Sequence, residues 1–265
     1  MKTPPPADNW QSGDPYERYI GRWSRLVAPP FVRWLDVPAG RRWLDVGCGT
    51  GALCGAIVDH AAPAAVTGVD PSEGFLDVAR ERLPASIAFH LGSATAIPLP
   101  DAAVDVVVSG LVLNFIPDPA AALREMARVA GRDARIGLYV WDYAGKMELL
   151  RTFWDAVAAV DPAAASLDEG ERFPLCDPDA LAATAAVAGL RAVDVTAIDV
   201  PTIFADFADL WEPFLGGQGP APSYLLALDE PTRTAVRETL RARLPRQDDG
   251  SIHLVARAWA LRSRA

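Results

Sequence analysis

The chain has 265 residues, of which 51% are hydrophobic, and a formal net charge of −9. This length is enough for one large α/β domain, or for one domain with a cap. A nucleic-acid partner is not expected, because binding to a polyanion needs clustered Lys and Arg. Small-molecule chemistry is favoured instead. The three cysteines form no metal or disulfide pattern, and their odd number is typical of a reducing compartment.

The first residues carry no signal for export. Residues 1–15 are polar and rich in proline, without the apolar core of a signal peptide. The longest uncharged run, 213–228, is interrupted by Gly and Pro and does not suit a bilayer. We therefore expect a cytoplasmic protein with no membrane span and no metal site.

Strands and helices alternate along the first half of the chain. Predicted strands cover residues 42–46, 65–70, 86–90, 104–109 and 134–140. Predicted helices cover 52–60 and 72–83, and a further helix begins at Asp118-Pro119. In the second half we expect helices at 145–160 and 178–188 and strands at 191–200 and 251–260. This order predicts an α/β fold with a doubly wound, mostly parallel seven-stranded sheet, an antiparallel last strand and helical cap insertions.

The segment 43–51, Trp-Leu-Asp-Val-Gly-Cys-Gly-Thr-Gly, is the most informative stretch. A short apolar strand leads into three glycines that allow a sharp turn and close approach of the backbone to a ligand. Nineteen residues after Gly51, Asp70 ends the next predicted strand, where a carboxylate binds a ribose diol. Asp45, just before the first glycine, would oppose a pyrophosphate and suits a cationic cofactor group. The alternative is that Asp45 only accepts hydrogen bonds from loop amides.

Three motifs taken together resemble the class I S-adenosylmethionine-dependent methyltransferases, in particular the ubiquinone/menaquinone-biosynthesis type (methyltransferase type 11). They are Leu44–Gly51, Gly68–Ser72 and Asp105–Ser109. The segment Tyr19–Ser24 also resembles the cofactor lid of that family. The resemblance covers about residues 16–140 and implies a Rossmann-like methyltransferase fold with S-adenosylmethionine as cofactor.

The resemblance also implies a set of cofactor-binding residues. The glycines would lie beneath the methionine and ribose, Asp70 would bind the ribose hydroxyls, and an arginine of the lid would pair with the cofactor carboxylate. One departure concerns Ser93, since many relatives have aspartate there. The implied residues are Tyr19, Arg22, Asp45, Gly47, Gly49, Gly51, Asp70, Pro71, Ser93, Ala94 and Ser109. The alternative for Tyr19 and Arg22 is a simple amphipathic first helix.

No general base is identified. Many relatives have a histidine after the fourth strand, whereas this chain has Leu113-Asn114-Phe115. Because a sulfonium is already an activated leaving group, positioning and exclusion of water are expected to do most of the catalysis. The remaining candidates for a catalytic role are His253, Tyr143 and Asp142.

The expected organisation has three parts. Residues 1–40 form an N-terminal arm and lid helix, 41–140 the S-adenosylmethionine-binding core, and 141–265 the remainder of the sheet with cap insertions at about 141–190 and 201–250. Aromatic residues in the cap favour a small apolar or aromatic acceptor. Homo-oligomerisation stays open, as do two other functions: a nicotinamide-dependent oxidoreductase, and a non-catalytic S-adenosylmethionine-binding protein.

Overall fold

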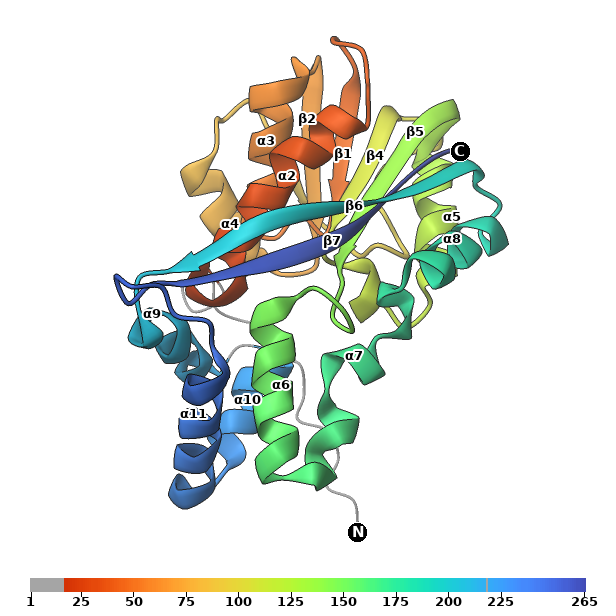
Figure 1. The fold of residues 1–265 in the computed structure, drawn as a ribbon. Helices are drawn as coiled ribbons and strands as arrows, with labels where there is room; N and C mark the ends of the chain where they lie inside the picture. Colours follow the sequence, from red (N-terminus) through yellow and green to blue (C-terminus); the bar gives the residue numbers. More distant parts are fainter. Residues whose placement is uncertain (1–16, 218) are drawn as a thin grey trace. The chain divides into compact units, whose positions relative to one another are not determined.

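A computed structural model describes residues 17–217 and 219–265 (Figure 1). The expectation for residues 1–15 lies outside the described residues. The chain divides into two compact units. The described part of unit 1 comprises residues 17–23, 142–174, 199–217 and 219–257, and unit 2 comprises 24–141, 175–198 and 258–265.

The sheet has seven strands in the order β3-β2-β1-β4-β5-β7-β6. Strands β1 to β5 pair in parallel, whereas β7 is antiparallel to β5, with Trp141 opposite Ala258. The predicted fold class is thereby confirmed. The strands are β1 (Arg42–Val46), β2 (Ala65–Asp70), β3 (Ala88–Leu91), β4 (Val104–Gly110), β5 (Ala130–Trp141), β6 (Arg191–Phe204) and β7 (Ile252–Arg264).

Helices cover the sheet of unit 2, and their starts follow local capping chemistry. The Asp118 side chain accepts from the Ala121 N–H at the start of α5, with Pro119 in the first turn. Ser72 caps α4 in the same way through the Phe75 N–H. The helical elements that lie wholly or mostly in unit 2 are α2 (Arg22–Trp34), α3 (Ala52–Ala61), α4 (Glu73–Arg82), η2 (Leu113–Phe115), α5 (Pro119–Val129), η4 (Pro174–Cys176) and α8 (Pro178–Val187).

Unit 1 is mainly helical. Its core is aromatic: α6 packs against α11, and Phe153 of α6 stacks on Phe214 with ring centroids 4.6 Å apart. Offset stacking of this kind adds to the free energy of burial. The elements are η1 (Glu17–Gly21), α6 (Glu148–Val160), η3 (Pro162–Leu167), α7 (Glu169–Arg172), α9 (Phe207–Trp211), η5 (Glu212–Gly216), α10 (Pro220–Ala227) and α11 (Glu230–Arg243).

Several element boundaries differ from the predictions. Strand β5 begins at Ala130 instead of 134. Strand β6 continues to Phe204, past Pro201, where the sequence indicated an end. A proline lacks the N–H that a central strand needs, but β6 is the last strand in the sheet order, and an edge strand tolerates it. Helix α6 begins at Glu148 instead of 145, because Asp142 accepts hydrogen bonds from the Gly145 and Lys146 amides and holds the preceding residues in a turn.

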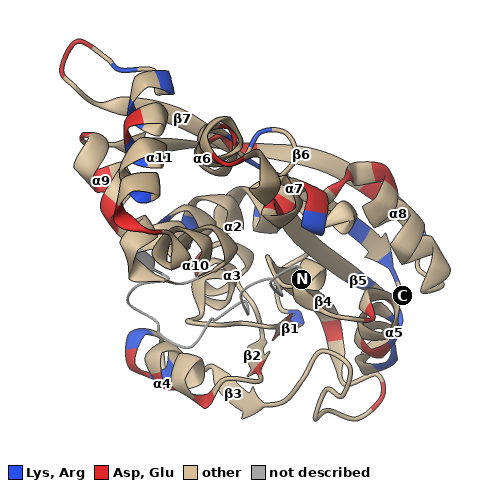
Figure 2. Cartoon of the chain, turned by 90° about the horizontal axis from the view of Figure 1, so that it is seen from below, with Lys and Arg blue, Asp and Glu red and all other residues tan. Residues whose placement is uncertain are grey.

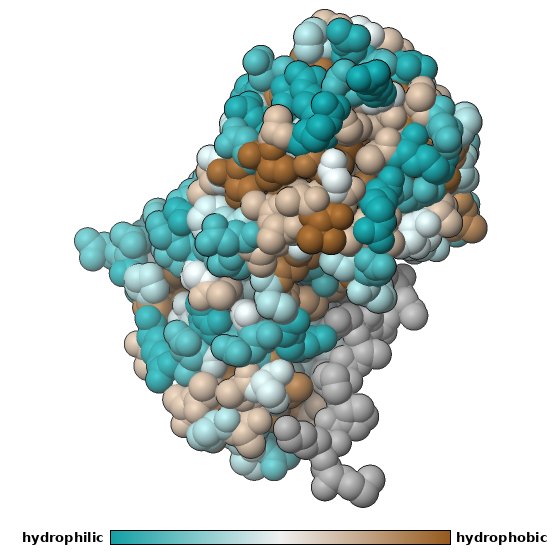
Figure 3. Space-filling view, turned by 90° about the vertical axis from the view of Figure 1, so that its right-hand side faces the viewer, coloured by the Kyte–Doolittle hydropathy of each residue, from teal (hydrophilic) through white to brown (hydrophobic). Residues whose placement is uncertain are grey.

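The surface mixes both charge signs. Acidic and basic residues alternate on α4 (Figure 2), where Arg80 pairs with Glu73 at 2.7 Å and Asp77 at 2.9 Å. Hydrophobic groups on the face in Figure 3 lie among hydrophilic ones. Within residues 17–217 and 219–265, no helix is both long and apolar enough to cross a membrane. The same residues contain no group of three or more His, Cys, Asp or Glu side chains that could hold a metal ion.

Candidate functional site

The loop between β1 and α3 depends on three glycines. Gly47, Gly49 and Gly51 have φ values of +73°, +53° and +88°, in the left-handed region that side chains disfavour. The N–H groups of Gly47 and Cys48 both donate to the Val69 carbonyl, at 2.7 and 3.1 Å. These hydrogen bonds hold the loop at the carboxyl end of β2, and ligands of parallel sheets bind at the carboxyl ends of the strands.

Steric surroundings distinguish the three glycines. A Cβ at Gly47 would lie 2.5 Å from a Val112 methyl carbon, and one at Gly51 would lie 2.3 Å from Leu83 Cδ1. A Cβ at Gly49 would meet nothing within 4 Å. A Cβ at Gly47 or Gly51 would thus require the Val112 or Leu83 side chain to move, whereas the open side of Gly49 is available to a ligand.

Asp70, at the end of β2, is held by backbone amides. Its Oδ2 accepts from the Gly49 N–H and its Oδ1 from the Ser72 N–H, both at 2.9 Å. The residue is 6% exposed, and burial raises the carboxyl pKa against the opposing effect of the two amides. A carboxylate has about four acceptor positions, so two remain for a ligand with two hydroxyls. Ser72, and not Asp70, caps α4.

Asp45 lies beneath the same loop with one oxygen unsatisfied. It is 1% exposed, its Oδ2 accepts from the Cys54 thiol at 3.3 Å, and its Oδ1 has no partner among the described residues. Burial raises the pKa of the carboxyl to about 7. A buried oxygen without a hydrogen bond is costly. It suits a ligand that brings a cationic N–H donor, such as the ammonium group of S-adenosylmethionine.

The other implied residues of unit 2 line the edges of this region. Pro71 is exposed, and Ser93 and Ala94 are half-buried after β3, where the Gly92 N–H donates to the Asp70 carbonyl at 3.1 Å. Ser109 is buried, and its hydroxyl donates to the Val46 carbonyl at 2.7 Å. The Ser109 side chain thus joins β4 to β1, although the hydroxyl oxygen can still accept a hydrogen bond.

Tyr19 and Arg22 belong to unit 1. The Tyr19 ring packs edge-on against Phe214, and its buried hydroxyl has no hydrogen-bond partner among the described residues. Arg22 donates to Asp209 at 2.8 Å, and its guanidinium lies over the rings of Trp23 and Phe204. Their lid function remains a prediction. Arg22 already has a carboxylate partner with which a cofactor carboxylate would compete.

The candidate catalytic residues are also in unit 1. Asp142 uses both carboxylate oxygens to accept from the Gly145 and Lys146 amides, at 3.0 and 2.9 Å. Tyr143 is buried and lies 5.5 Å from the Phe173 ring centroid. His253 is exposed near the start of β7, and its Nε2 lies 3.0 Å from the Ser251 hydroxyl. These hydrogen bonds show that Asp142 stabilises the turn before α6. Catalytic roles for Tyr143 and His253 remain predictions.

Two further polar residues stand out in the structure. In unit 2, both polar atoms of the Asn114 amide are buried without a hydrogen-bond partner among the described residues. In unit 1, Glu169 is 2% exposed, accepts from the Trp154 indole N–H, and has a pKa raised to about 7 by burial. The position of Asn114 after the fourth strand was a signal in the sequence. Nothing in the local sequence distinguished Glu169 from a surface residue.

Part of the chain is similar to known methyltransferases. Residues 44–136 match the model of a family described as a methyltransferase domain. An uncharacterized methyltransferase of Mycobacterium tuberculosis is 42% identical over 127 residues, which are 48% of this chain and 49% of that protein. The malonyl-[acyl-carrier protein] O-methyltransferase of Serratia marcescens is 38% identical over 118 residues, 44% of this chain and 45% of that protein.

Likeness to solved structures extends further along the chain. The YcgJ protein of Bacillus subtilis superimposes with a TM-score of 0.58 at 19% identity, covering 90% of this chain and 97% of that one. At that identity the likeness concerns the fold. The chain spans about half the length of the curated relatives that it matches. The family resemblance predicted from the sequence is thus confirmed for residues 44–136.

Proposed function

Because residues 44–136 match a methyltransferase domain, we propose that the chain transfers the methyl group of S-adenosylmethionine to a small-molecule acceptor. When bound, the cofactor supplies a methyl group on a positively charged sulfur, which leaves as a neutral thioether. The residues of the chain then have to hold the reactants in line and keep water away.

The observation that carries this proposal is the pair of carboxylates around the glycine loop. Asp70 has two acceptor positions free beside two backbone amides, as a ribose diol requires. Asp45 has a buried oxygen without a donor, as an ammonium group requires. A dinucleotide would instead bring a pyrophosphate close to Asp45, at an electrostatic cost. The residues therefore fit S-adenosylmethionine better than a nicotinamide cofactor.

Positioning is the main source of catalysis in this proposal. A well-oriented displacement gains on the order of 7–11 kcal/mol from orientation and avoided solvent reorganisation. Asn114 suits such a task, because its amide presents a buried donor and a buried acceptor with no protein partner among the described residues. We assign Asn114 to orienting a polar group of the bound reactants. A histidine at that position would exchange protons, which Asn114 does not.

The proposed acceptor is apolar or aromatic, and the residue composition of unit 1, taken by itself, supports this class of molecule. Its buried aromatic residues, among them Phe153, Trp154 and Phe214, favour an apolar or aromatic acceptor. Glu169 is the group there best suited to accept a proton, because a base works best with a pKa near the working pH. Burial raises the Tyr19 pKa, and the charge of Glu169 raises it further, so Tyr19 stays a neutral donor.

Calorimetric titration tests the cofactor first. S-adenosylmethionine and S-adenosylhomocysteine are titrated into the chain, with NAD(H) and NADP(H) in parallel. Binding of the two sulfur compounds alone supports the proposal, and binding of a nicotinamide cofactor alone refutes it. Release of label from methyl-tritiated cofactor to a panel of phenols, carboxylic acids and amines then tests transfer. Cofactor binding without transfer to any acceptor would favour a non-catalytic binding protein.

Two variants test the acceptor assignment once an acceptor is found. Glu169→Gln should lower kcat at pH 7 and remove an inflection near pH 7 from the kcat profile, while cofactor affinity stays unchanged. Trp154→Phe, which removes the indole N–H but keeps the carboxyl, should keep an inflection and move it to higher pH, because the indole hydrogen bond lowers the Glu169 pKa. A Glu169→Gln profile identical to that of the parent chain would remove Glu169 from the mechanism.

A further inference from the structure

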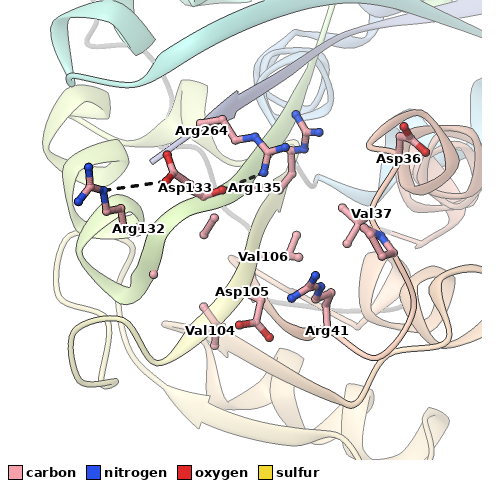
Figure 4. A pocket seen from close by; sticks show the side chains of 13 residues that line it. Asp36, Val37, Arg41, Val104, Asp105, Val106, Arg132, Asp133, Arg135 and Arg264 are labelled. Atoms are coloured by element: carbon pink, nitrogen blue, oxygen red, sulfur yellow. Dashed lines mark hydrogen bonds and ion pairs between the residues drawn. The ribbon is translucent and has the colours of Figure 1, made fainter.

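A cavity lies at the other end of the unit 2 sheet from the glycine loop, where the parallel strands begin (Figure 4). It has a volume of about 290 Å³. Residues before β1, at the starts of β4 and β5 and at the end of β7 line it, so four separate chain segments contribute. This volume is near the lower limit of small-molecule sites.

The cavity has an excess of positive charge in a chain that is acidic as a whole. Four arginines and three aspartates line it. Two of the aspartates have arginine partners from outside the lining: Asp105 accepts two side-chain bonds from Arg42, and Asp133 pairs with Arg191 at 2.7 Å. Asp133 also lies 4.0 Å from Nε of Arg132, which is itself part of the lining. The remaining carboxylate, Asp36, forms no ion pair with the described residues. The lining arginines are Arg41, Arg132, Arg135 and Arg264.

Arg135 is the least satisfied of these arginines. Its Nε is buried and donates to no acceptor among the described residues. Burial lowers the pKa of this guanidinium below its usual range, and the like charges of Arg264 and Arg262 lower it further. Figure 4 shows the guanidinium groups of Arg135 and Arg264 near each other. The planar guanidinium group of arginine forms paired hydrogen bonds with oxyanions, and two or more neighbouring guanidinium groups favour a doubly charged oxyanion.

We propose that this cavity binds the phosphate group of a small molecule, with Arg135 and Arg264 as the principal donors and Arg41 at the rim. The Arg135 Nε would gain the acceptor that the protein does not provide. The site is independent of methyl transfer, because it lies at the amino-terminal ends of the parallel strands, whereas Asp45 and Asp70 lie near their carboxyl ends. Its failure and that of the proposed function are therefore separate outcomes.

Titration calorimetry on the full chain at constant ionic strength tests this site. The probes are inorganic phosphate, glycerol 3-phosphate and glycerol. We expect saturable binding of both phosphates with a Kd below about 1 mM and no binding of glycerol. Tighter binding of glycerol 3-phosphate would indicate a phosphomonoester as ligand, and equal affinity would indicate free phosphate. Absence of saturable binding for both phosphates would refute the site.

Arg135→Gln should weaken phosphate binding about tenfold or more, because it removes charge-assisted hydrogen bonds. It should leave the melting temperature in phosphate-free buffer unchanged or higher, since a buried and repelled charge is removed. Arg264→Gln, at the exposed end of β7, should weaken binding without affecting the core. Arg124→Gln on the exposed side of α5 is the matched control. Folded Arg135→Gln and Arg264→Gln variants with unchanged affinity would overturn the assignment.

Discussion

Proton linkage at Asp45 gives a quantitative test of the cofactor site. The buried carboxyl has a pKa of about 7, so the ligand-free chain holds it mostly protonated at pH 6. An ammonium group binds the ionised carboxylate, and ligand binding should therefore displace the proton. Because the apparent affinity scales with the competent fraction, S-adenosylhomocysteine should bind more tightly as the pH rises.

The magnitude follows from that pKa. The ionised fraction is about 0.09 at pH 6 and about 0.76 at pH 7.5, which predicts an approximately eightfold gain in affinity. At pH 6.5 binding should release about 0.8 proton. Above this range the α-amino group of the ligand itself begins to lose its proton. Calorimetry at pH 6.5 in two buffers with different ionisation enthalpies measures the released proton directly.

Asp45→Asn should abolish both the pH dependence and the proton release, and should weaken binding at pH 7.5. Asp118→Asn is the control, because asparagine caps a helix as well as aspartate does and the Asp118 side chain accepts from the Ala121 amide of α5. Affinity that is constant from pH 6 to 7.5 in the parent chain would refute the assignment of Asp45 to the ammonium group.

Asp45→Asn, which should weaken ligand binding, should increase the stability of the ligand-free chain. Since folding raises the Asp45 pKa from 3.8 to about 7, the carboxyl favours the folded state most at low pH, and this contribution is lost as the pH rises through about 7. At pH 8 the buried charge costs at most about 4 kcal/mol. Asp45→Asn should therefore raise the melting temperature of the ligand-free chain at pH 8, and a lower one would contradict this sign.

Three further substitutions separate binding from folding. Asp70→Ala should weaken S-adenosylmethionine binding tens-fold or more, because losing charge-assisted hydrogen bonds costs about 2–4 kcal/mol, and unchanged affinity in calorimetry would exclude the ribose role. Gly49→Ala should lose cofactor affinity with only the modest cost of a positive φ, since its Cβ enters the open side of the loop; equal losses of affinity and of unfolding free energy would refute this. Gly51→Ala should destabilise the chain by roughly 1–3 kcal/mol more than Gly250→Ala in urea unfolding. The φ values of the two glycines match, so Gly250→Ala is the control for backbone strain. The Cβ at position 51 would lie 2.3 Å from Leu83, whereas the Cβ at position 250 would meet nothing within 4 Å. Equal urea midpoints for those two variants would show that the loop moves to admit the methyl group.

The amino-acid sequence alone determined the order of the elements in the first half of the chain. Most β-strands there contain a short apolar run, and most turns are marked by glycine, proline or a capping side chain, so the local conformation follows from neighbouring residues. The three loop glycines belong to this class, because a positive φ is a local requirement. The family resemblance rests on these same residues and is confirmed over 44–136.

The tertiary structure determined the end of β6, the burial of unpaired polar atoms and the composition of the cavity, none of which the local sequence pattern contains. Pro201 continues β6 because that strand lies at the sheet edge, a fact of topology. Asp45 and Asn114 carry unsatisfied polar atoms because distant segments bury them without supplying partners. Arg41, Arg135 and Arg264 line one cavity only because the starts of β1 and β5 and the end of β7 lie side by side in the sheet. Burial and long-range electrostatics depend on residues far apart in the chain, and for that reason they became visible only in the folded protein.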